Sequence, residues 1–108
     1  MSIIGIFAEA FRGQKRSLST SIIITEDLLI QLLDARIIND DEYERINTQY
    51  GMTSKVIQLL DYLQRTSSKF FVPFCKIMVN TGHNHVVEMM LNNIPSTMRV
   101  IVDPQITG

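Results

Sequence analysis

Apolar residues recur at helical spacing along most of the chain. In the clearest segment, residues 53–66, they follow the i, i+3, i+4, i+7 pattern of one buried helix face: Val56, Leu59, Leu60 and Leu63. Residues 25–35 repeat this pattern, with Glu26 and Asp27 in the first turn, where acidic side chains favour a helix N-terminus. The spacing therefore predicts two helices with leucine-rich buried faces.

Three further helices are predicted over residues 40–49, 68–81 and 84–92. Asn39 and Glu42 have the three-residue offset of a capping box at the start of the first of them. Gly82, between the other two, suits a left-handed helix C-cap. Pro73 has no amide hydrogen and clashes with the carbonyl four residues back, so it must stand in the first turn of its helix.

The N-terminal segment carries a weaker helical pattern. Residues 3–16 are amphipathic, with apolar side chains at Ile4, Phe7, Ala8 and Phe11. Gly13 and the serines and threonines at 17–21 weaken the second half, because both residue classes lower helix propensity. We therefore expect a first helix that is bent or broken.

The C-terminal segment shows no helical periodicity after Pro95. Its one apolar run, Val100–Val102, is β-prone and is followed by turn-forming residues. Together, these patterns predict an all-α fold, an antiparallel six-helix bundle over residues 1–93, followed by a mostly flexible tail over residues 94–108.

Composition narrows the classes of function. The chain has 108 residues, 45% of them apolar, which suits one compact domain. Its net charge of -1 gives too weak a field to hold nucleic acid by bulk electrostatics. The single cysteine, Cys75, indicates a reducing, cytoplasmic location. The run Ser2–Ala8 is too short for a signal peptide, and no apolar stretch reaches the ~18 residues of a membrane span.

The order and spacing of the apolar anchors resemble the caspase recruitment domain (CARD) of the death-fold superfamily, over about residues 5–92. The resemblance rests on Leu28-Leu29, Leu32-Leu33-Asp34, Ile37-Ile38, Asp41–Ile46, Lys55, Leu59–Leu63, Phe70–Phe74, Thr81-Gly82-His83 and Val87–Leu91. The sequence departs from the family in two places. Serines and threonines at residues 17–21 replace stronger helix formers, and Ile30 and Gln31 are uncharged where some relatives carry acids. The resemblance implies a Greek-key helical bundle. It also implies a protein of the CARD-only type, which has no enzymatic activity.

Charge is distributed unevenly along the chain. Seven of the eleven acidic residues lie between Glu26 and Glu44. CARDs pair a basic surface of helices 1 and 4 with an acidic surface of helices 2 and 3 on a neighbour, so the resemblance implies two partner-binding patches. The basic patch would comprise Arg12, Lys15, Arg16, Lys55 and Arg65. The acidic patch would comprise Asp34, Asp40, Asp41, Glu42 and Glu44.

The resemblance also implies a class of function and of partner. We expect an adaptor or regulator of apoptotic or inflammatory signalling, including innate immunity, that binds by homotypic CARD–CARD contact. A decoy inhibitor, which occupies a partner's surface, is one form of this function. The expected partner is another CARD-containing protein, such as an initiator caspase, an adaptor or an innate immune sensor. Self-association is a further expectation, because a head-to-tail contact can repeat.

Two other functions stay open from the residues alone. Cys75 with His83 or His85 would serve a thiol-dependent enzyme, since a thiolate needs a nearby base, although no glycine-rich oxyanion loop is present. Methionines of the last two helices, Met78, Met89 and Met90, would suit a helical peptide-binding module. The cysteine and histidines lack the spacing of a zinc site, and no phosphate-binding loop occurs, so no catalytic residue, metal or cofactor is predicted.

Overall fold

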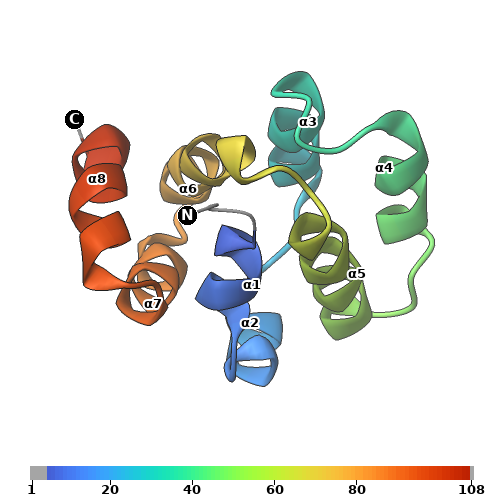
Figure 1. Ribbon diagram of the computed structural model, residues 1–108. Helices are drawn as coiled ribbons and strands as arrows, with labels where there is room; N and C mark the ends of the chain where they lie inside the picture. Colours follow the sequence, from blue (N-terminus) through green and yellow to red (C-terminus); the bar gives the residue numbers. More distant parts are fainter. Residues whose placement is uncertain (1–4, 108) are drawn as a thin grey trace.

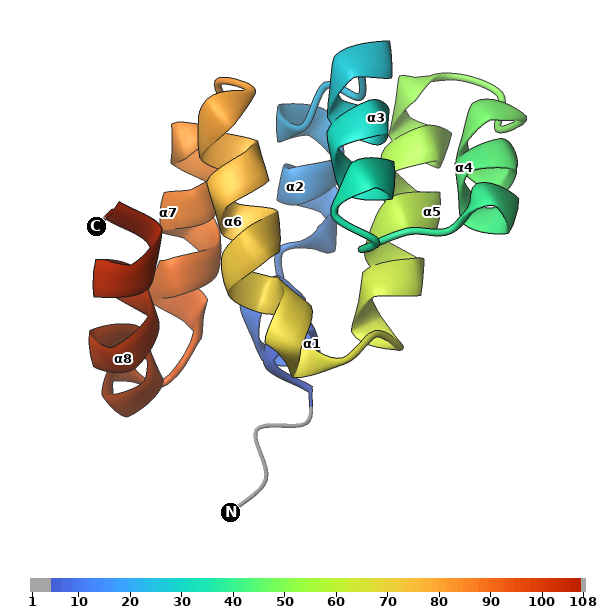
Figure 2. The same ribbon diagram turned by 90° about the horizontal axis from the view of Figure 1, so that it is seen from above.

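The computed structural model describes residues 5–107, which contain eight α-helices and one 3₁₀ turn (Figures 1 and 2). The helices are α1 (Ile6–Phe11), α2 (Lys15–Ser21), α3 (Glu26–Asp34), α4 (Asp40–Asn47), α5 (Met52–Gln64), α6 (Phe71–Asn80), α7 (Asn84–Asn93) and α8 (Ser96–Thr107). The 3₁₀ turn η1 (Ser68–Phe70) precedes α6. The described residues contain no strand, and the predicted all-α class is confirmed.

The first predicted helix consists of two helices, α1 and α2, joined by a sharp turn. Gly13 makes this turn with a φ of +73°, a left-handed conformation that favours glycine. The Gln14 side-chain amide donates to the carbonyl oxygens of Ala10 and Met89, both at 2.8 Å, and so ties the turn to α7. The predicted break is confirmed at this glycine. The expected helix start, including Ile4, lies outside the described residues.

Side chains cap the starts of α3 and α4. The Thr25 hydroxyl accepts a hydrogen bond from the Leu28 amide at 3.1 Å, and Asn39 Oδ1 accepts one from the Glu42 amide at 2.8 Å. Each bond satisfies an amide that has no partner within its helix. The predicted cap by Asn39 is confirmed, but the Glu42 half of the capping box is not, because the Glu42 carboxylate accepts from Gln58 instead of from the Asn39 amide.

The end of α6 follows the predicted geometry. Gly82 has a φ of +84°, and the His83 amide donates to the Met78 carbonyl at 2.8 Å, as in a Schellman C-cap. Pro73 is the third residue of α6, where its missing amide hydrogen removes no helix bond. Both predictions are confirmed.

One apolar core receives side chains from all eight helices. Phe7 of α1 lies at its centre, with ring centroids 5.9 Å from Phe11, 5.4 Å from Phe71 and 5.8 Å from Phe74. Core side chains of α3, α4, α5 and α6 that are 2% exposed or less include Leu29, Leu32, Ile46, Leu60, Leu63 and Phe74. The predicted inward face of α5 is confirmed, whereas Ala8, which was assigned to the apolar face of the first helix, is exposed.

The C-terminal segment is helical, and the prediction of a mostly flexible, β-prone tail is wrong in its secondary structure. Residues 96–107 form α8, which packs against α6 and α7. Met98, Val102 and Ile106 face the core at a spacing of four residues, with Val102 only 9% exposed. This contact outweighs the low helix propensity of the β-branched residues. The domain boundary between residues 93 and 94 stays a prediction.

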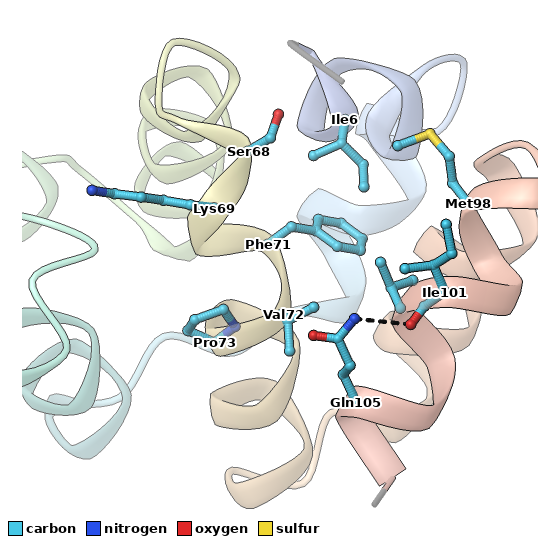
Figure 3. Close-up of a pocket in the computed structure, with 10 residues that line it drawn as sticks. Ile6, Ser68, Lys69, Phe71, Val72, Pro73, Met98, Ile101 and Gln105 are labelled. Atoms are coloured by element: carbon cyan, nitrogen blue, oxygen red, sulfur yellow. Dashed lines mark hydrogen bonds between the residues drawn. The ribbon is translucent and has the colours of Figure 1, made fainter. Parts of the chain in front are cut away.

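A hollow of about 480 Å³ separates part of α6 from α8 (Figure 3). Phe71 and Val72 of α6 face Met98 and Ile101 of α8 across it. Its lining is mainly apolar, and beside it Met98, Val102 and Ile106 pack α8 against the core. No helix among the described residues has the length and apolar character that crossing a lipid bilayer would require.

Candidate protein-interaction surfaces

Three of the five predicted basic residues gather at the turn between α1 and α2. Arg12 caps the C-terminus of α1, and its guanidinium lies 3.1 Å from the Glu9 carboxylate. Lys15 begins α2 and pairs with Asp61 of α5. Arg16 is exposed, and its side chain has no acidic partner within residues 5–107. We call Arg12, Lys15 and Arg16 the basic cluster.

A groove of about 540 Å³ opens between α2 and α5 beside the basic cluster. Its lining consists of Lys15, Arg16, Ser19, Thr20, Thr53 and Ile57. Ile57 is 39% exposed, so the groove combines an accessible apolar side chain with two cations. We call this feature the α2–α5 groove.

The other two predicted basic residues belong to α5, Lys55 in its first turn and Arg65 at its C-cap, four residues after the Asp61 that pairs with Lys15. Their membership of one five-residue patch stays a prediction. The half-buried Lys55 ammonium donates to the carbonyl oxygens of Ile46 at 3.3 Å and Asn47 at 2.9 Å, at the C-terminus of α4. A cation at this end of a helix is stabilising. Arg65 is exposed at the far end of α5, about 15 Å from Lys55 along the helix axis.

Four of the five predicted acidic residues are exposed on α3 and α4. Asp34 is the last residue of α3, Asp40 and Asp41 begin α4, and Glu44 follows in the next turn. These two helices pack against each other. We call Asp34, Asp40, Asp41 and Glu44 the acidic face.

Glu42 does not belong to the acidic face, which corrects its assignment to a partner-binding patch. Its side chain is 0% exposed and points into the contact between α4 and α5. Oε2 accepts a hydrogen bond from Gln58 at 3.0 Å, whereas Oε1 has no hydrogen-bond partner and lies 3.8 Å from the Arg45 guanidinium. Glu42 is thus a buried group that contributes to the α4–α5 contact.

Sequence reasoning missed residues of both surfaces. On α3, Asp27 and Ile30 share the outward face with Asp34, and Ile30 is 44% exposed. The spacing of three and four residues between them is the signal that could have identified this stripe. On α5, Asp61 brings an acid into contact with the basic cluster, and no local pattern in the sequence indicates that contact.

A family model supplies the identity of this helical bundle. The model of the caspase recruitment domain matches residues 8–93. The chain belongs to the caspase recruitment domain family. The matched range runs from within α1 to the end of α7, so α8 follows the part of this CARD that the family model covers. Searches of curated proteins and of solved structures gave no match. CARDs bind other CARDs and act in signalling, and this places the chain among protein-interaction modules.

Cys75 does not have the surroundings of a nucleophile in this CARD. Its side chain is fully buried, and this burial raises the pKa of the thiol to about 12. Both ring nitrogens of His83 are engaged: Nε2 accepts from the Ile23 amide at 3.0 Å, and Nδ1 lies 3.0 Å from the Thr81 hydroxyl. His83 is therefore not free to act as a base, and the thiol-enzyme hypothesis loses its support.

Met78, Met89 and Met90 do not form the open site that the sequence suggested. Met78 and Met90 are fully buried, and Met89 packs against the core, so the three methionines on which the peptide-binding alternative rests do not line an open groove. Within the described residues, no three of the His, Cys, Asp and Glu side chains come together in a way that could hold a metal ion.

A hydrogen bond fixes α3 relative to α4 at the acidic face. The Tyr43 hydroxyl donates to the Glu26 carboxylate, at 2.9 Å for Oε2, and this bond raises the pKa of Tyr43. Because Tyr43 also packs against the core, it holds the two helices in one arrangement. The acidic face is thus presented by two connected helices.

Proposed function

We propose that this CARD is an adaptor or regulator of apoptotic or inflammatory signalling, which acts in the cytoplasm by homotypic contact with the CARD of another protein. The observation that supports this proposal most is the position of two unlike charged surfaces on one CARD. The basic cluster lies on α1 and α2, and α2 is at the lower edge of the molecule in Figure 1. The acidic face lies on α3 and α4, towards the upper and right-hand edges.

Such surfaces can select a partner that presents acidic side chains to the basic cluster or basic side chains to the acidic face. Complementary charge accelerates the encounter and penalises partners that bring like charges together. The proposed partners are CARD-containing proteins, such as an initiator caspase, an adaptor or an innate immune sensor. A net charge of -1 argues against nucleic acid as a partner, and the contacts of Cys75 and His83 argue against an enzyme.

Binding to a panel of purified CARDs tests this proposal, with Arg16→Glu and Asp41→Lys as variants. Each reversal should weaken binding by about tenfold or more, because it brings like charges together. Lys69→Glu is the control, since Lys69 is exposed on η1, outside both surfaces. Arg16→Glu and Lys69→Glu should keep the stability of the wild type to within about 0.5 kcal/mol, whereas Asp41→Lys should lose about 1 kcal/mol, because it places a cation in the first turn of α4.

Salt provides an independent measurement in the same assay. Raising the ionic strength from 0.05 to 0.5 M should weaken the wild-type complex, because the screening length between exposed charges falls from about 14 Å to about 4 Å. If a CARD binds, but neither reversal nor salt changes its affinity, the charge-pairing mechanism is wrong. If no CARD in the panel binds, the proposed class of partner is wrong.

An adaptor and a decoy inhibitor differ in their effect on the partner. In a reconstituted system in which CARD contact activates a caspase, an adaptor should increase caspase activity. A decoy should lower this activity in proportion to its occupancy of the partner's CARD. Arg16→Glu should abolish either effect, which links the outcome to the basic cluster.

A further inference from the structure

Helix α8 has apolar side chains on two sides. One side, centred on Val102, packs against the core. On the other side, Val100, Ile101 and Pro104 are joined by Thr97 at the i, i+3, i+4, i+7 spacing of a buried helix face. All four residues are nevertheless exposed, Val100 by 72% and Ile101 by 64%. We call Thr97, Val100, Ile101 and Pro104 the α8 stripe.

The α8 stripe lies at the edge of the molecule. Figures 1 and 2 both place α6 and α7 on one side of α8, and no other helix of the described residues lies beyond it. The family model ends at residue 93, so the stripe is outside the part of this CARD that the family model covers. The same spacing is buried on α5, whereas on α8 it stays exposed. An apolar face that is left exposed in this way is typical of a protein contact.

The α8 stripe is complementary to itself. The step from Thr97 to Val100 equals the step from Ile101 to Pro104, so the spacing is the same in both directions along the helix. In an antiparallel pair of α8 helices, Thr97 of one copy therefore lies opposite Pro104 of the other, and Val100 lies opposite Ile101. A two-fold axis between positions 100 and 101 relates the two copies, as in other isologous contacts.

The charges beside the stripe favour the same arrangement. Arg99 and Asp103 lie one turn apart on the Val100 side of the stripe, and their side chains are 31% and 38% exposed. An antiparallel pair places Arg99 of each copy beside Asp103 of the other, whereas a parallel pair brings like charges together. A hollow of about 650 Å³, lined in part by Arg99, Val100, Asp103 and Pro104, gives a side chain of the second copy room to insert. A second copy thus matches both the stripe and its flanking charges.

We propose that the α8 stripe is a dimerisation surface, on which two copies of this chain pair through antiparallel α8 helices. The contact is closed, because both copies use the same surface and neither has that surface left for a third. It therefore differs from a head-to-tail contact between the two charged surfaces, which can repeat. The basic cluster and the acidic face lie on other helices and stay exposed in the dimer, so this inference does not rest on the proposed function.

Sedimentation velocity over a concentration series measures the self-association of the wild type, Val100→Glu and Ile23→Glu. Val100→Glu should weaken dimerisation by at least about tenfold, because it would bury a carboxylate at the centre of the contact. Ile23→Glu is the matched control, since it adds the same charge at a side chain that is 59% exposed between α2 and α3. This control should change dimerisation by less than about twofold. Repeating the series in the Arg16→Glu background removes the basic cluster from the measurement and should leave the dimer intact.

Disulfide cross-linking tests the antiparallel geometry. A disulfide forms when two Cα atoms lie within about 7 Å of each other. Val100→Cys is beside the two-fold axis, so an oxidant such as diamide should link two copies. Thr97→Cys should not link to itself, because the two positions are about 10 Å apart along the helix axis, but it should link to Pro104→Cys in a mixture. Ile23→Cys is the exposed control, and the native Cys75 is fully buried and does not compete.

The outcomes separate this inference from the proposed function. A wild type that stays monomeric at its highest soluble concentration, or Val100→Glu that dimerises like the wild type, overturns the α8 dimer. Linking of Thr97→Cys to itself indicates a parallel pair and overturns the antiparallel arrangement. A monomeric wild type that binds a CARD of the panel, and loses this binding in Val100→Glu, assigns the stripe to that partner and also overturns the dimer. In each case, the effect of Arg16→Glu on binding to the panel still tests the proposed function.

Discussion

His83 joins two parts of the chain that are sixty residues apart, and we predict that its replacement destabilises the bundle. The Ile23 amide, in the connection between α2 and α3, donates to His83 Nε2 at 3.0 Å. The ring proton must then be on Nδ1, which faces the Thr81 hydroxyl at 3.0 Å, and that hydroxyl donates to the Ile77 carbonyl at 2.9 Å. The bond from the Ile23 amide requires a neutral imidazole, because a protonated Nε2 cannot accept.

The size of the effect follows from the groups that lose their partners. His83→Ala leaves the amide of Ile23 without an acceptor, at a cost of about 1–3 kcal/mol, and the space left by the ring adds to this. We expect a total loss of about 2–4 kcal/mol, which lowers the Tm of a domain of this size by at least about 8 °C. His83→Gln can place an amide oxygen near the position of Nε2, so it should keep the acceptor and cost about 1 kcal/mol.

The same contact predicts how stability depends on pH. Burial, and to a smaller extent the charge of His85, lowers the pKa of His83 below 6.5. Below pH 6.5 the unfolded chain therefore binds a proton that the folded chain excludes, so the free energy of unfolding falls as pH falls. The limiting slope for one proton is about 1.4 kcal/mol per pH unit, and the contribution is fully present above pH 6.5.

Urea unfolding of the wild type and His83→Gln between pH 5.5 and 8 measures this slope. The wild type should lose stability below pH 6.5 more steeply than His83→Gln, which has no proton to exclude at this site. His85→Gln serves as the control for the neighbouring imidazole and should retain most of the wild-type slope. Equal slopes for the wild type and His83→Gln would refute the reasoning.

Three further predictions follow from burial. Leu60→Ala should cost about 2–5 kcal/mol in urea unfolding, because Leu60 is fully buried, whereas Ile57→Ala should change stability by about 0.5 kcal/mol or less. Cys75 should react with an alkylating reagent at pH 8 only as the chain unfolds, since a pKa of about 12 leaves roughly one thiol in ten thousand ionised. Deletion of residues 96–108 should lower the Tm by about 8 °C or more through the loss of Val102 packing, and an unchanged Tm would contradict the role given to α8.

The sequence predicted those elements whose signals are local. The leucine spacing of residues 25–35 and the cap at Asn39 act within a few residues of each other, and the structure has both where they were expected. In α8 the local signal is misleading, because Val100–Val102 favours a strand in isolation. What makes this segment helical is contact with α6 and α7, and such long-range contacts cannot be read from the segment itself.

The charged residues show the same limit at the interaction surfaces. Glu42 and Lys55 were assigned to opposite patches, yet both are used at the contact of α4 with α5, where one is buried and the other caps α4. Reversing either charge would disturb folding as well as binding, because a buried carboxylate or a helix cap loses its partners. Arg16 and Asp41 are exposed, so their variants disturb the folded chain much less and report mainly on binding. Burial therefore decides which charged residues can test the proposed function, and burial is a property of the folded chain.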